Sequence, residues 1–110
     1  MSQSVTRRGA RSREEMLAEL ARQAPTLRRL GVTSLGLFGS YARNEQTLDS
    51  DADLLATFDH LTFRAYMDAK LLLEAALSLS VDLVLADDLR PRLREHVLHE
   101  VIYAVSCADF

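Results

Sequence analysis

Three aspartates and a Gly-Ser pair have the types and spacing that suit a site for a metal ion and a phosphate. Asp51 and Asp53 stand two apart at the start of an apolar run, so in a strand their side chains point to the same face. Asp82 lies one residue into a later apolar run and joins them if the two strands pair. Carboxylates on one face repel one another, and a hard divalent cation with oxygen ligands, Mg²⁺ fitting best, relieves that repulsion.

Gly39 and Ser40 suit the phosphate side of such a site, because they break the apolar run of residues 32–38. A glycine turn after a strand lets the backbone approach a phosphate, and Ser40 with the N–H groups of the next turn offers hydrogen-bond donors. Phosphate donors beside metal-binding acids predict a nucleotide site.

Other polar residues are explained without a ligand. Asp49, Asp87 and Asp88 suit a solvated turn or a helix cap. His96 and His99 have a spacing that metal ligands can use, but they lie opposite the apolar stripe of their predicted helix, which favours an exposed polar face.

Composition indicates one small domain. The chain has 110 residues, is 48% hydrophobic and carries a formal charge of −3, which allows one core and leaves no room for a second lobe. One cysteine, Cys107, excludes an internal disulfide and a cysteine-based zinc site and suits the reducing cytoplasm. No apolar run approaches the ~18 residues of a membrane span.

The start of the sequence is basic, with Arg7, Arg8, Arg11 and Arg13 close together. We expect residues 1–13 to form a flexible basic tail and residues 14–110 to form the folded domain. Nucleic-acid binding by the tail is disfavoured, because the domain is net acidic and shows no interleaving of aromatic and basic residues.

The hydrophobic pattern predicts an α/β (α+β) fold, with a small mixed sheet of about three strands and helices packed on it. We expect a helix over residues 14–23 with Ser12 as its N-cap, extended over 27–30, and a long helix over 64–79. Strands are expected over residues 32–38, 52–58 and 81–86.

A last helix is predicted after Asp87 or Asp88, either of which can cap it, with Pro91 in its first turn. Its apolar residues recur at helical spacing, and we expect this stripe to be buried: Leu93, Val97, Val101 and Val105.

The order Gly39-Ser40, ten residues, then Asp51-x-Asp53 resembles the G-S-x10-D-x-D signature of the DNA polymerase β-like nucleotidyltransferases. Asp82, after a helix, resembles their third carboxylate. The stretch GSYARNEQTLDSDADLL is similar to the minimal branch of that superfamily, the MNT-domain antitoxins that pair with HEPN-domain toxins. The resemblance covers about residues 32–103.

Two residues depart from that pattern. Asn44 stands where a glycine commonly follows the arginine, and Ala52 stands where a β-branched residue is usual between the acids. Neither departure removes a predicted ligand.

The resemblance implies a role for each carboxylate. Asp51 and Asp53 would bind the Mg²⁺ that holds the nucleoside triphosphate. Asp82 would complete a second metal site and help to take the proton from the acceptor hydroxyl.

The resemblance also implies the other parts of the reaction. Gly39 and Ser40 would hold the triphosphate of ATP, and Arg43 would reach the leaving phosphates. The implied reaction transfers AMP from ATP to a tyrosine of a partner HEPN ribonuclease toxin and silences it. An antitoxin that retains the fold and works by binding alone remains the alternative.

Overall fold

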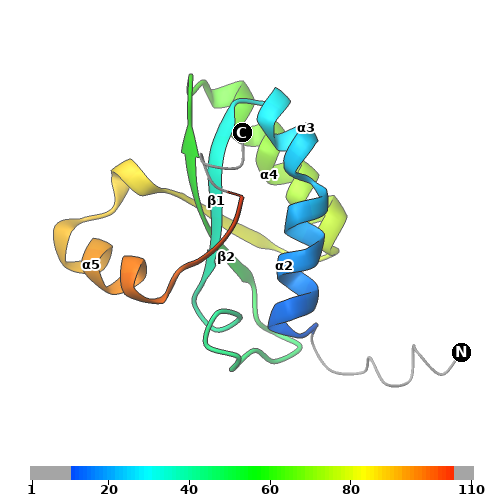
Figure 1. Ribbon diagram of the computed structural model, residues 1–110, viewed down its shortest axis with the longest axis vertical. Helices are drawn as coiled ribbons and strands as arrows, with labels where there is room; N and C mark the ends of the chain where they lie inside the picture. The colour runs from blue at the N-terminus through cyan, green and yellow to red at the C-terminus, as the bar shows by residue number, and fades with distance from the viewer. Residues whose placement is uncertain (1–10, 106–110) are drawn as a thin grey trace, which may run out of the picture.

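The computed structural model describes residues 11–105, and these form a four-stranded sheet with α2, α3 and α4 packed against one face (Figure 1). The elements are α2 (Arg13–Arg22), α3 (Ala24–Arg29), β1 (Val32–Phe38), β2 (Ala52–Phe58), α4 (Phe63–Leu77), β3 (Val81–Leu85), the 3₁₀ turn η1 (Ala86–Asp88), α5 (Pro91–Glu100) and β4 (Ile102–Val105). The predicted fold class is confirmed, with one strand more than expected.

The strand order β3-β2-β1-β4 brings one end of three strands together. β1 runs antiparallel to β2, so Phe38 at the end of β1 pairs with Asp53 near the start of β2. β3 runs parallel to β2 after the α4 crossover, and Asp53 pairs with Asp82. The end of β1 and the starts of β2 and β3 therefore share one edge of the sheet.

The helix boundaries follow local signals. Ser12 and Glu15 form a capping box at the start of α2, with bonds of 3.1 Å from the Glu15 N–H and 2.9 Å from the Ser12 N–H. Thr62 caps α4 by accepting a 3.0 Å bond from the Ala65 N–H. Ser78 adopts a left-handed conformation, φ +57°, which ends α4 two residues before the predicted boundary.

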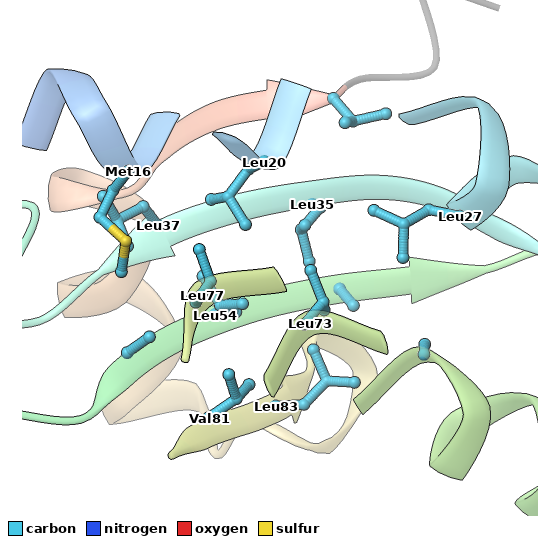
Figure 2. Close-up of a cluster of buried hydrophobic side chains, with 14 of the residues drawn as sticks. Met16, Leu20, Leu27, Leu35, Leu37, Leu54, Leu73, Leu77, Val81 and Leu83 are labelled. Carbon is cyan, nitrogen blue, oxygen red and sulfur yellow. The ribbon is translucent and has the colours of Figure 1, made fainter. Parts of the chain in front are cut away.

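The main hydrophobic core lies between the sheet and the helices α2, α3 and α4 (Figure 2). The helices contribute Met16, Leu20, Leu27, Leu73 and Leu77, and the strands contribute Leu35, Leu37, Leu54, Val81 and Leu83. Tyr66 joins α4 to β3 by donating a 2.7 Å hydrogen bond to the Leu83 carbonyl. This packing fixes β2 and β3 beside each other.

The prediction of a last helix that runs to Val105 is wrong. α5 ends at Glu100, and residues 102–105 form β4, which pairs antiparallel with β1. Isoleucine, valine and tyrosine are strong strand formers, and the open edge of β1 gives them a partner. The predicted stripe is therefore divided between two elements, with Leu93 and Val97 on α5 and Val105 on β4. On α5, Val97 is buried, whereas Leu93 is 53% exposed.

The predicted cap of that helix is also wrong. Asp87 and Asp88 lie in η1, and Arg90 occupies the N-cap position of α5 without a side-chain cap bond. Pro91 at the first helical position starts the helix instead, because its fixed φ suits the first turn.

Part of the predicted basic tail can be described. The carbonyl of Arg11 accepts a 2.8 Å bond from the Gln46 side chain, and Arg13 donates a 3.1 Å bond to the Ala42 carbonyl. Arg7, Arg8 and Cys107 lie outside the described residues. Between residues 11 and 105, no helix has the length and apolar character needed to cross a membrane.

Gly36 of β1 permits the contact between β1 and the segment that leads into β4. A Cβ at Gly36 would lie 2.5 Å from Val101 Cγ2 and 3.1 Å from Tyr103 Cδ1. The Gly36→Ala variant should therefore lose about 1–3 kcal/mol of unfolding free energy through overpacking, measured by urea denaturation.

The Val101→Ala variant provides the control for this prediction. It removes the Cγ2 atom, so the Gly36→Ala, Val101→Ala double variant should be more stable than the sum of the two single losses predicts. Strict additivity of the two losses would contradict the contact.

Candidate active site at the shared end of β1, β2 and β3

The three predicted acids lie at the shared edge of the sheet. Asp53 and Asp82 are register partners on the parallel strands β2 and β3, and Asp51 stands two residues before Asp53. Asp53 is half-buried, whereas Asp51 and Asp82 are exposed. The neighbours Ala52 and Leu54 are buried in the main core, so the acids belong to the opposite face. The predicted pairing of the second and third strands is confirmed.

Gly39 lies directly against Asp53. Its φ of +76° is left-handed, and a Cβ at this position would collide with Asp53 Oδ2 and come within 2.9 Å of Asp53 Cγ. Both facts require glycine here. Gly39 therefore makes room for the Asp53 carboxylate, a need that its sequence context did not indicate.

The electrostatic environment of Asp53 is strongly negative. Burial raises the pKa of its carboxyl group above the ordinary value, and the charges of Asp82 and Asp51 raise it further. Arg43 acts in the opposite direction, and Glu100 adds to the increase. The site thus concentrates negative charge that one arginine only partly offsets.

The donor set suits a hard divalent cation, because the three aspartates offer only carboxylate oxygens and share an excess of negative charge. Their side chains do not converge: within residues 11–105, no group of three or more His, Cys, Asp or Glu side chains is arranged so that it could hold a metal ion. The chemistry of the residues fits Mg²⁺, and Asp53 and Asp82 lie opposite each other as register partners on β2 and β3.

The turn after β1 is closed by two backbone hydrogen bonds. The Arg43 N–H donates to the Gly39 carbonyl at 3.1 Å, and the Glu45 N–H donates to the Ser40 carbonyl at 2.8 Å. Tyr41 and Ala42 are buried and anchor the turn in the core.

Asn44 explains one departure from the family pattern. Its φ is +62°, a left-handed conformation that glycine adopts freely and that asparagine tolerates better than other residues. Asparagine thus preserves the backbone that a glycine would give.

Glu100 lies beside the Gly39 turn, and the sequence analysis did not identify it as a candidate. Its carboxylate accepts a 2.8 Å hydrogen bond from the Gly39 N–H and bonds of 3.1 and 3.3 Å from Arg43 Nη1. Arg43 also donates from Nε to Glu45 at 3.0 Å. Gly39 and Glu100 are 61 residues apart, so no local pattern signals their contact.

Comparison with known proteins places this geometry in a family. The model of the family described as "Nucleotidyltransferase domain" matches residues 17–104, which include both the acids and the Gly39 turn. The chain belongs to this family. The protein adenylyltransferase MntA of Thermococcus cleftensis is 39% identical to this nucleotidyltransferase over 92 residues, covering 82% of this chain and 93% of the relative.

Two solved structures resemble the nucleotidyltransferase. One, assigned to the minimal nucleotidyltransferases, has a TM-score of 0.75 and 39% identity and covers 84% of this chain and 95% of its own. The other is the complex of a tri-AMPylated Shewanella oneidensis HEPN toxin with an MNT antitoxin, with a TM-score of 0.57 and 22% identity, covering 81% of this chain and 71% of the matched chain. The second likeness establishes the fold alone.

The contact between Gly39 and Asp53 can be tested by substitution. Gly39→Ala should cost about 1–2 kcal/mol of stability because of its left-handed φ and should also displace the Asp53 carboxylate. We expect calorimetry to show that this variant lacks the binding of ATP with Mg²⁺ that the resemblance implies for the parent, while the fold remains.

Gly31→Ala is the matched control. Gly31 also has a left-handed φ, +98°, but its nearest heavy atoms lie 3.8 Å from an added Cβ. The control variant should lose comparable stability and keep nucleotide binding. Equal loss of binding in both variants would contradict the role of the Asp53 contact.

Proposed function

We propose that this nucleotidyltransferase is an antitoxin that transfers AMP from ATP, with Mg²⁺, to a tyrosine hydroxyl of a partner HEPN ribonuclease toxin and so neutralises it. The observation that carries the proposal is the pairing of Asp53 with Asp82 beside the Gly39 turn. Two comparisons support it: a relative named protein adenylyltransferase and a fold neighbour in a complex with an AMPylated HEPN toxin.

In this proposal the three aspartates have different roles. Asp51 and Asp53 hold Mg²⁺, which when bound would neutralise the charge of the phosphates. Asp82 takes the proton from the tyrosine hydroxyl. The tyrosine oxygen forms a bond to the α-phosphorus, and the bond between that phosphorus and the β-phosphate bridging oxygen breaks, so pyrophosphate leaves.

The turn after β1 would bind the triphosphate. The Gly39 N–H and Ser40 supply donors to phosphate oxygens, and the Arg43 guanidinium supplies a positive charge near the leaving group. Tyr41 and Ala42 hold the turn rigid because they are buried.

The partner would supply the acceptor tyrosine. We take residues 14–110 as the catalytic domain, acting in the cytoplasm, and expect α5 and β4 to contribute to the partner surface. Leu93 and Leu98 of α5 are 53% and 45% exposed, and Tyr103 of β4 is 47% exposed. In the proposed complex the partner would cover these apolar side chains.

A second candidate is an antitoxin that neutralises its partner by binding alone. The observation in its favour is that the three aspartates do not converge within the described residues. The two candidates differ in whether AMP is transferred.

Transfer of label from α-³²P-ATP to the product of the neighbouring gene tests the proposed function. With Mg²⁺ we expect the partner to become labelled and its ribonuclease activity to fall. Asp53→Ala should abolish labelling without unfolding the domain, because it removes a ligand and relieves repulsion between carboxylates. Neutralisation without any label would favour binding alone.

Asp82 separates catalysis from nucleotide binding. Asp82→Asn keeps the size of the side chain and removes its charge. We expect ATP binding within several-fold of the parent and a loss of about a hundredfold or more in single-turnover transfer, since general-base assistance is typically worth ~10²–10⁴. Transfer at the parental rate would show that Asp82 takes no part in the chemistry.

A further inference from the structure

The donors that the proposed function assigns to a phosphate already bind an anion of this chain. The Glu100 carboxylate accepts from the Gly39 N–H at 2.8 Å and from Arg43 Nη1 at 3.1 and 3.3 Å. A backbone N–H and a guanidinium that converge on one carboxylate form an oxyanion site, because phosphate and carboxylate oxygens accept from the same donors. In this structure the Glu100 carboxylate occupies that oxyanion site.

Glu100 occupies that site as a carboxylate. Its side chain is only 17% exposed, and this burial by itself raises the pKa of the carboxyl group. The bonds from Gly39 and Arg43 outweigh the burial, so the pKa is lower than usual. Glu100 is therefore charged at neutral pH and mimics a phosphate oxyanion.

Glu100 and a phosphate cannot both accept a hydrogen bond from the Gly39 N–H at the same time. The Gly39 amide has a single hydrogen, which makes one strong hydrogen bond. A triphosphate beside Glu100 would also bring further negative charge to a site where Asp51, Asp53 and Asp82 are opposed mainly by Arg43. Departure of Glu100 frees the Gly39 N–H and removes one of the negative charges.

We propose that Glu100 is the resting occupant of the nucleotide's phosphate subsite, and that a triphosphate binds at the Gly39 N–H and Arg43 by displacing its carboxylate. This inference rests on the proposed function, since it takes that turn as the triphosphate site. Glu100 holds Gly39 and Arg43 in position for an anion, and it lowers the apparent affinity for ATP by the fraction of time that it fills the subsite.

Isothermal calorimetry on Glu100→Gln tests the displacement, with ATP and Mg²⁺ as one probe and inorganic tripolyphosphate as the other. If the carboxylate fills the subsite about nine-tenths of the time, its neutralisation should tighten the apparent Kd about tenfold. Both probes should bind more tightly to the variant, because the Glu100 carboxylate competes with a phosphate group and both probes carry phosphates. An unchanged or weaker affinity would overturn the proposal and make Glu100 a structural clamp.

Glu45→Gln is the matched control. Glu45 accepts a 3.0 Å hydrogen bond from Arg43 Nε and is 65% exposed. Its substitution by Gln removes one negative charge beside the same guanidinium. We expect its Kd to change less than about twofold, as for exposed ion pairs. A gain equal to that of Glu100→Gln would overturn displacement and leave only a general effect of charge.

A second variant keeps the test decisive if Glu100→Gln proves unfolded in a thermal melt. Glu100→Asp keeps the charge near Arg43 but withdraws the carboxylate from the Gly39 N–H by one methylene, and it should also tighten binding of tripolyphosphate. No gain in this variant would overturn the proposal. Failure of the parent to label its partner, with tighter binding by the variants, would refute the proposed transfer and leave the anion subsite supported.

Discussion

The packing of the Asp53 carboxylate against the backbone of Gly39 is the constraint on which the site depends. β1 and β2 pair with Phe38 opposite Asp53, so the turn after β1 must leave the sheet directly over that side chain. Only a residue without Cβ fits there, and the left-handed φ of Gly39 turns the chain away at the same point. One glycine thus allows the acid to approach and turns the chain away from the sheet.

The same edge carries a charge that the fold must tolerate. Asp53 is half-buried beside Asp82, and burial with like charges raises the pKa of its carboxyl group. Burial of neighbouring apolar residues on the other face of β2, Ala52 and Leu54, holds the strand in place despite this cost. A carboxylate pair kept at a cost to stability is typical of residues retained for chemistry.

The sequence was sufficient for elements set by local pattern. The bounds of β1 and β2 were predicted as observed, because each apolar run ends at clear turn residues. The end of the chain was not predictable in this way: Leu93, Val97, Val101 and Val105 have helical spacing, but pairing with β1 converts the last part into a strand. Glu100 was missed for a related reason, since its partners lie 57 and 61 residues away in the sequence.

The wrong end of the last helix and the omission of Glu100 have one structural cause, the pairing of β4 with β1. Where β4 pairs with β1, the chain must leave its helix, and α5 ends at Glu100 beside the Gly39 turn. The edge pairing of β4 therefore leaves Glu100, the last residue of α5, beside the turn after β1, where its carboxylate accepts hydrogen bonds from the Gly39 N–H and from Arg43.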